Sequence, residues 1–440
     1  MAGDKKHMKK ILLATVATAA LIASPASAMT LRGALEATLE SSPQIAGARA
    51  QLEQAEQGIY QARSGFLPQV TAEGEWADSS QEAGGNEVDS QPRTYSIALS
   101  QPLFNGGTTR ASYLAQKRFY DASFAALENT EQQVLYNAAQ AYMAVLRDIE
   151  ILDLNNFQVE VLERQLEATN TRFELGDVTR TDVSQAQARL AAAKAAATQA
   201  EGVLTSSKAM FQEVVGIPAG DLDWPDMTVQ IPSSWQSVES KVLDTHPLIQ
   251  AAVSQLSAQD MNVDAARGDF LPDLTANASY QKQEGISGFS IYSSDEVESQ
   301  VLSLNLSVPL FRGGQVKASY NSAKAAMRES EESLRQSQRQ VRSELVDAFN
   351  AFKTVRARLR SLEDTVKASS LALEGVENEA NVGSRTVLDV LDARQELLQA
   401  QVDLTSARSD VVSTTFRLIA AMGQLTADDV DTLLSESLPQ

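Results

Sequence analysis

The stretch SGFLPQVTAEGEW at residues 64–76 returns 204 residues later as GDFLPDLTANASY at 268–280. In each copy Phe-Leu-Pro ends a segment of helical composition, because proline cannot continue a helix and pushes the preceding leucine towards extended geometry. After the proline, apolar and polar side chains alternate, which is the period of a β-strand. Each copy therefore predicts a helix that ends at the motif and a strand that begins there.

Two further motifs repeat in the same order along the chain. SQPLFNGG at 100–107 returns as SVPLFRGG at 307–314, at an offset of 207 residues. RFELGDVTRTDV at 172–183 returns in outline as NEANVGSRTVLDV at 378–390, with its glycine shifted by the same 207 residues. Three motifs that recur in one order at nearly constant spacing indicate a tandem duplication.

The duplication divides the chain into five parts. The first repeat is predicted at 29–215 and the second at 241–425. A linker at 216–240 joins them, and a short C-terminal segment follows at 426–440. Residues 1–28 are predicted to combine an N-terminal extension with a secretory signal peptide that is removed.

The signal peptide is predicted from the pattern of its residue types. Lys9 and Lys10 precede an apolar run at 11–23 that is too short to span a bilayer as a helix. Small residues at 26–28 then supply a cleavage site, so the mature chain is expected to start near Met29. The alternative is a buried N-terminal helix.

Charge and composition exclude several classes of protein. The chain carries a formal net charge of −20 and has no cysteine. So acidic a protein has no electrostatic attraction for nucleic acid, and no nucleic-acid partner is expected. The lack of thiols excludes disulfides, thiolate metal sites and cysteine-linked lipid anchors. After Met29 no run of about 18 apolar residues occurs, which excludes a membrane-spanning helix.

No motif typical of catalysis is present, so the protein is not expected to be an enzyme or to hold a cofactor or metal. His246 is the only histidine after the signal peptide. It precedes Pro247 at a place where the first repeat has Ser42 before Pro43. We therefore expect His246 to cap a helix; a general base or a metal ligand is the alternative.

Two strands are predicted in each repeat, with a polar loop between them. The strands are expected at 68–78, 93–103, 272–284 and 298–310, and the loops at 78–93 and 285–298. Strands of about ten residues with one apolar and one polar face suit a transmembrane β-barrel. The alternative is a half-buried hairpin of a soluble sandwich. Four strands cannot close a barrel, so the chain is expected to oligomerise, and spacing alone leaves dimer and trimer open.

Segments of helical composition at 31–63 and 236–267 precede the Phe-Leu-Pro motifs, and much longer helices follow the strands. Residues 108–175 contain neither proline nor glycine, and residues 315–382 contain only Gly375. Each long segment spans on the order of 100 Å as a helix. One coiled-coil seam with alternating steps of four and three residues comprises Val341, Leu345, Ala348, Phe352, Val355, Leu359, Leu362 and Val366. Two helical hairpins are predicted.

The repeated Phe-Leu-Pro, the repeated Pro-Leu-Phe-x-Gly-Gly and the string VGSRTVLDVLDAR at 382–394 resemble the TolC family of outer-membrane channels. The resemblance covers about 30–425. It implies a mixed fold, in which a long α-helical coiled-coil barrel of helical hairpins joins a transmembrane β-barrel. Each protomer would supply four strands to a trimeric, twelve-stranded barrel.

The resemblance also implies a function and a location. The protein would lie in the cell outer membrane, with its helical part in the periplasm. It would be the exit duct of tripartite efflux and type I secretion systems, and would pass drugs or polypeptides to the outside. Its partners would be two further copies of itself, outer-membrane lipid, a periplasmic adapter protein, and an inner-membrane transporter of RND or ABC type.

Two groups of charged residues at the ends of the hairpins acquire roles through this resemblance. Asp389 and Asp392 would form a carboxylate ring at a periplasmic gate, where mutual repulsion is expected to raise their pKa values. The alternative is that these carboxylates form a solvated helix face. Arg385 would pair with Asp182, beside Thr181, as a latch between protomers. Ala380 replaces a family tyrosine of this latch, so the latch is expected to be weaker or built differently.

The hairpin tips themselves are expected to dock the adapter. The residues concerned are Gly176, Asp177, Gly383 and Ser384. Glycine at each tip is expected to end a helix in the left-handed conformation. A competing interpretation is a non-conducting coiled-coil structural protein of the cell envelope. That class, like a soluble adapter, would explain the seam but not the amphipathic strands.

Overall fold

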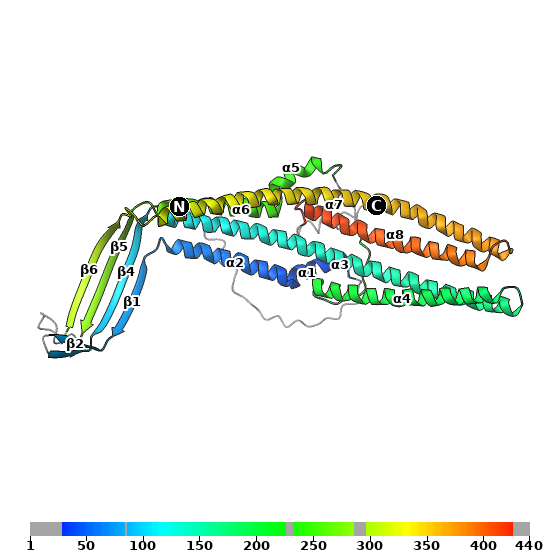
Figure 1. The fold of residues 1–440 in the computed structure, drawn as a ribbon, viewed down its shortest axis with the longest axis horizontal. Helices are drawn as coiled ribbons and strands as arrows, with labels where there is room; N and C mark the ends of the chain where they lie inside the picture. Colours follow the sequence, from blue (N-terminus) through cyan, green and yellow to red (C-terminus); the bar gives the residue numbers. More distant parts are fainter. Residues whose placement is uncertain (1–28, 84–85, 226–231, 286–295, 426–440) are drawn as a thin grey trace, which may run out of the picture.

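The structure is a computed structural model that describes residues 29–83, 86–225, 232–285 and 296–425. The predicted signal peptide at 1–28 and C-terminal segment at 426–440 lie outside these ranges. So do parts of the linker at 216–240 and of the loop at 285–298. A sheet lies at one end of the molecule, and long helices run side by side from it to two hairpin tips at the other end (Figure 1).

The two repeats contribute matching elements, except that the hairpin of β2 and β3 in the first repeat has no counterpart among the described residues of the second. The helices are α1 (Leu31–Ser41), α2 (Pro43–Ser64), α3 (Thr108–Glu174), α4 (Arg180–Val215), α5 (Gln236–Thr245), α6 (Pro247–Gly268), α7 (Gln315–Asn381) and α8 (Val387–Ala421). The strands are β1 (Gln69–Trp76), β2 (Ser79–Ala83), β3 (Asn86–Ser90), β4 (Arg93–Asn105), β5 (Asp273–Glu284) and β6 (Glu296–Ser307). The two long helices, α3 and α7, have 67 residues each.

A proline divides the helical segment before each Phe-Leu-Pro motif. Pro43 is the first residue of α2 and Pro247 the first residue of α6, where a missing N–H costs no hydrogen bond. The side chains before them cap these helices: Ser42 accepts from the N–H of Ile45, and Nδ1 of His246 accepts from the N–H of Leu248 at 3.2 Å. The structure thus agrees with the expected capping role of His246. Burial lowers the pKa of this imidazole, which favours its neutral form.

The four long strands form one antiparallel sheet in the order β1-β4-β5-β6. The register of this sheet aligns the expected alternation of apolar and polar side chains from strand to strand. Val70 pairs with Leu99, Leu99 with Ala278, and Ala278 with Leu302, so apolar side chains share one face. That face is uncovered in the protomer: Leu302 is 85% exposed. β1 and β6 are the edges, and each has one neighbour among the strands that the structure describes.

The segment predicted as a loop at 78–93 differs from that expectation. β2 and β3 pair there as a separate two-stranded hairpin beyond the end of the main sheet. The sequence of this hairpin is mostly polar, with Ala83 and Val88 as its apolar residues, so it lacks the apolar alternation by which the longer strands were predicted.

The core lies midway along the helices, where α1, α3, α4, α7 and α8 meet. Tyr142, Phe211 and Phe416 are among its largest fully buried side chains. The hydroxyl of Tyr142 lies 2.7 Å from the carbonyl oxygens of both Met29 and Asp223, and it accepts from the N–H of Asp223. Burial raises the pKa of this phenol to about 12, so it stays protonated at physiological pH. One side chain thereby ties the first described residue to the connection between the repeats.

The seam predicted along α7 is buried at Val341, Leu345, Ala348 and Phe352 and becomes partly exposed closer to the tip. Within the described ranges, no helix is both long and apolar enough to cross a membrane.

The sheet joins the helices through an unusually close backbone contact. Gly106 has a φ of +64°, and a Cβ placed on it would lie 2.2 Å from the carbonyl oxygen of Gly268. Nearby, the hydroxyl of Thr108 donates to the carbonyl of Ala265 at 3.1 Å. Only glycine therefore fits at residue 106. Gly313, its counterpart in the second repeat, has a φ of +59° but nothing within 4 Å of the same position.

Candidate functional site

The two hairpin tips are built in the same way. At the first tip the N–H of Gly176 donates to the carbonyl of Phe173, and that of Asp177 to the carbonyl of Arg172. At the second tip, the N–H groups of Gly383 and Ser384 make the equivalent bonds to Ala380 and Glu379. Both glycines have a φ near +80°, and both patterns satisfy the last carbonyls of a long helix. The predicted left-handed turns are thus present at both tips.

The helices that leave the tips begin with matching capping boxes. The Thr179 hydroxyl accepts from the N–H of Asp182, and the Asp182 carboxylate accepts from the N–H and hydroxyl of Thr179 at 2.8 Å. Thr386 and Asp389 make the same bonds at the start of α8. The two aspartates stand 207 residues apart, which is the offset of the repeat. Asp389 therefore has a local structural function that Asp182 shares.

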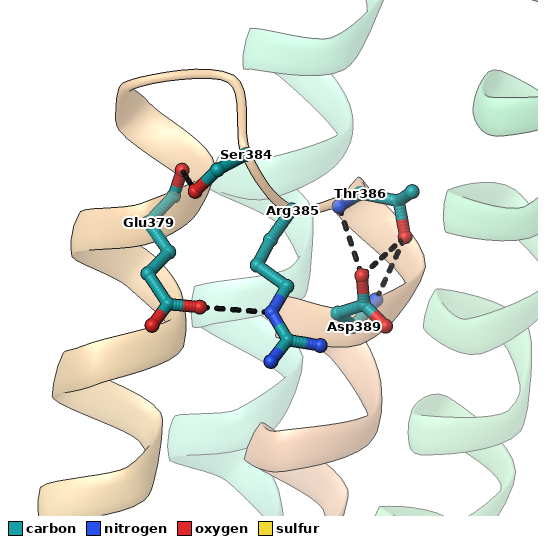
Figure 2. A network of polar contacts seen from close by, with 5 residues as sticks. All are labelled: Glu379, Ser384, Arg385, Thr386 and Asp389. Carbon is teal, nitrogen blue, oxygen red and sulfur yellow. Dashed lines mark hydrogen bonds and ion pairs between the residues drawn. The ribbon is translucent and has the colours of Figure 1, made fainter.

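The second tip carries an additional ion pair, which Figure 2 shows. Nε of Arg385 donates to a Glu379 carboxylate oxygen at 2.8 Å, across the turn from α7. The Ser384 hydroxyl donates to the carbonyl of the same glutamate at 2.9 Å. Both partners of the ion pair are about half exposed, so it adds little to stability and can exchange for another partner.

A cleft of about 520 Å³ lies between the two tips of one protomer. Its charged lining residues are Arg172, Asp177, Asp182, Glu377, Arg385 and Arg394. Arg394 donates to Glu377, while its buried Nε has no partner within the part of the chain that the structure describes. Charges of both signs thus face a polar cleft at the far end of the molecule from the sheet.

The two predicted gate carboxylates have different hydrogen-bond partners in the structure. Hydrogen bonds from the backbone N–H and the hydroxyl of Thr386 lower the pKa of Asp389. Within one protomer that pKa therefore moves opposite to the expected rise. Asp392, one turn further along α8, instead reaches Arg189 of α4 at 2.5 Å and ties the two hairpins together.

Two of the three predicted latch residues line one cleft but do not pair within the protomer. Asp182 and Arg385 both face the cleft, yet Arg385 binds Glu379 and Asp182 binds Thr179. These bonds from the backbone and hydroxyl of Thr179 also lower the pKa of Asp182. Thr181 lies beside Asp182 in the first turn of α4.

Sequence reasoning missed two partners of these residues, Glu379 and Arg189, and it also missed the pair of Arg394 and Glu377 in the same cleft. The pair of Arg385 and Glu379 is six residues apart across a turn, whereas Arg189 and Asp392 are 203 apart. Only the former could have been found from local spacing. Among the described residues, no group of three His, Cys, Asp or Glu side chains could hold a metal ion.

Comparisons with known proteins assign both repeats to the same family. The family model described as outer membrane efflux protein matches residues 34–216 and 238–424. The chain is 28% identical over 437 residues to the outer membrane efflux protein BepC of Brucella suis, covering 99% of this chain and 94% of that protein. It is 29% identical over 433 residues to the outer membrane protein TolC of Vibrio cholerae, covering 96% and 97%.

Solved structures show the same fold. The Campylobacter jejuni CmeC outer membrane channel matches with a TM-score of 0.81 at 19% sequence identity, over 93% of this chain and 90% of that one. This likeness confirms the predicted fold class, in which helical hairpins continue into a four-stranded contribution to a β-barrel.

Proposed function

Because the chain belongs to the outer membrane efflux protein family, we propose that it works as a homotrimeric exit duct, which receives its cargo from a periplasmic adapter and an inner-membrane transporter. The protein is a channel component of the outer membrane, with its helical part in the periplasm. The family consists of outer membrane channels rather than enzymes, and we assign this chain no catalytic step.

One observation carries the proposal: the protomer leaves its membrane sheet incomplete. Within the part of the chain that the structure describes, the four-stranded sheet has two unpaired edges, β1 and β6, and an uncovered apolar face. Lipid offers no hydrogen bonds to such edges, so they need strands from other copies. β6 of one copy and β1 of the next would run antiparallel, which continues the order of the sheet. Three copies would close twelve strands around a water-filled interior.

The duplication supports a specific contact between neighbouring copies. Inside one protomer, the loop at Gly106 meets the end of α6 at Gly268. In the other repeat the corresponding residues are Gly313 and Ser64, and Gly313 has open space around it. We propose that α7 of one protomer meets α2 of the next as α3 meets α6. Gly313 would then face Ser64 of the neighbouring copy.

Cysteine pairs provide a test of this contact, because the natural chain has no cysteine. A Cβ on Gly268 would lie 2.3 Å from Oγ1 of Thr108, so T108C/G268C is expected to form a disulfide within one chain. Q315C and S64C occupy the corresponding positions of the other repeat. We expect that pair to crosslink three chains, visible as dimer and trimer bands on a non-reducing gel. Only monomer bands from Q315C/S64C would contradict the proposed contact.

The hairpin tips are the proposed docking surface for the adapter. At each tip an apolar residue stands directly before the glycine, and both are highly exposed: Leu175 is 73% exposed and Val382 80%. They occupy the same position in the two repeats. Gly176 and Gly383 leave the backbone beside them open, with nothing within 4 Å of a Cβ position. Large exposed apolar side chains on a polar tip favour contact with a protein partner. The adjoining Asp177 and Ser384 would add polar contacts.

The inner-membrane transporter of the assembly would be of RND or ABC type.

The entrance is proposed to be closed by charges at the tips. Three copies of Asp389 and Asp392 would form the carboxylate ring, and Arg385 of one copy would pair with Asp182 of the next, beside Thr181. The exposed Arg385–Glu379 pair supports this exchange, because little free energy holds the arginine within its own protomer. On opening, Arg385 would return to Glu379.

Conductance in planar bilayers separates a duct from a non-conducting strut. Purified trimer is expected to pass ions in small, defined steps. R385E should raise the conductance several-fold, because it removes the proposed contact between protomers. Adding D182R should restore part of the closure through the reversed pair. Absence of current in every variant would refute the duct. Current that is equal in wild type and R385E would refute only the latch.

A further inference from the structure

Unpaired basic residues collect where the helices meet the membrane sheet. Three positions are basic in both repeats of this acidic chain: Arg63 and Arg267, Arg110 and Lys317, and Lys117 and Lys324. All six side chains are exposed, and none has an ion-pair partner among the described residues.

Two of these cations lie at helix ends where the helix dipole disfavours a positive charge. Arg63 and Arg267 lie in last turns, where the helix dipole favours a cation. Arg110 and Lys317 lie in the first turns of α3 and α7, where the dipole disfavours one. Neither first turn contains an acidic residue. An anion from outside the chain would account for cations at these two helix starts.

An aromatic pair accompanies the cations in each repeat. The rings of Phe66 and Tyr113 meet edge to face at 6.0 Å, as do those of Phe270 and Tyr320. Lys117 and Lys324 place their Nζ atoms 5.9 and 5.4 Å from the tyrosine rings one helical turn before them. Because α3 and α7 start at the sheet, side chains that tilt towards the helix N-terminus point towards the membrane. Tyrosine and lysine so placed suit the level of lipid headgroups.

A cavity of about 830 Å³ lies at this junction, among α3, α6 and the start of α7. Arg110 and Arg267 line it together with one acidic residue, Asp264. Its remaining walls include Leu114, Met261, Phe270, Leu271 and Tyr320. Two guanidinium groups beside an apolar, aromatic wall match a phosphate that is attached to a hydrocarbon chain. The volume falls in the range of small-molecule sites.

We propose that this cavity binds the headgroup and upper acyl chain of an anionic phospholipid from the periplasmic leaflet of the outer membrane. Arg110 and Arg267 hold the phosphate, and the Phe270–Tyr320 pair lines the side of the cavity that faces the acyl chain of the lipid. The inference rests on the membrane placement of the sheet in the proposed function. It adds a lipid class and the residues that recognise it.

Native mass spectrometry of trimers extracted from mixed phosphatidylglycerol and phosphatidylcholine vesicles tests the proposal. Wild type is expected to retain phosphatidylglycerol over phosphatidylcholine by on the order of tenfold. R110Q/R267Q should lose most of that preference. R358Q/R360Q, which removes two exposed cations far along α7, should keep it. K324Q removes the exposed cation beside Tyr320 of the cavity wall, so it provides a second test if the arginine variant does not assemble, and it should weaken the preference.

Several outcomes would overturn the proposal. Equal retention of the two lipids by wild type would do so, as would an unchanged preference in the variants that lack the junction cations. Release of the lipid by millimolar glycerol phosphate would identify a site for soluble phosphates instead. Conductance in pure phosphatidylcholine is measured in parallel. A conducting trimer without lipid preference refutes this inference and leaves the proposed duct intact, whereas a loss of both would count against the duct itself.

Discussion

A channel in which Asp389 and Asp392 are both alanine is expected to lose block by a trivalent cation applied from the periplasmic side, by at least about tenfold in the blocking concentration. In the proposed trimer these residues place six carboxylates around a narrow axis, and acidic rings attract multivalent cations. Cation selectivity should fall as well. The measurement is a titration of single-channel current with the trivalent ion.

The structure suggests a control variant that distinguishes the effect of losing the carboxylate ring from the effect of weakening the helix cap. T386A removes the hydroxyl that bonds to both the carboxylate and the N–H of Asp389, keeps the backbone N–H of residue 386 as a donor, and leaves both carboxylates in place. It should keep the block at neutral pH. Because the hydrogen bonds of Thr386 lower the pKa of Asp389, the wild-type carboxylate stays charged as the pH falls through its usual range. In T386A, protonation and loss of block should therefore occur at a higher pH. Unchanged block in the double alanine variant would exclude both aspartates from the gate.

The same pKa shift has a consequence for helix stability. A carboxylate whose pKa is lowered by folding stabilises the folded state above its unfolded pKa, and this contribution disappears as the pH falls through the folded pKa. The starts of α4 and α8 should both fray in acid, because Asp182 and Asp389 cap them in the same way.

Replacing Gly106 with alanine is expected to destabilise the protomer by about 2–4 kcal/mol, from the left-handed backbone together with the steric overlap. The new methyl group would lie 2.2 Å from the carbonyl oxygen of Gly268. α6 would have to move away from the sheet junction, which also disturbs the Thr108–Ala265 hydrogen bond. Denaturant unfolding followed by circular dichroism measures the loss.

Gly107 is a matched control for this substitution. It has a φ of +85° and nothing within 4 Å of a Cβ position, so G107A shares the backbone cost without the collision. The difference between G106A and G107A isolates the contact between the junction loop and α6. Equal destabilisation by the two variants would mean that the close approach contributes nothing.

Local patterns in the sequence were sufficient for the elements with a clear period. The alternation at Val70–Trp76 and at Leu274–Tyr280 predicted strands, and the proline-free stretches predicted α3 and α7. The repeat offset located both tips. The divisions at Pro43 and Pro247 were also readable, because a capping side chain followed by proline is a helix start.

Contacts between distant residues could not be predicted in this way. Arg189 and Asp392 come together only because two separate hairpins lie side by side, and no spacing rule links them. The capping function of Asp389 was available from the sequence through its repeat partner Asp182, but resemblance directed attention to the gate instead. The hairpin of β2 and β3 depends on backbone pairing between mostly polar residues, which leaves no alternation of apolar and polar side chains.

The ion pair between Arg189 and Asp392 also determines how force passes through a tip. It joins α4 of one hairpin to α8 of the other at 2.5 Å, so it couples the two hairpins for as long as it is formed. Its two side chains are 40% and 56% exposed, and dissolved ions screen a pair so placed. This ion pair therefore couples the two hairpins more strongly in dilute solution than in concentrated salt.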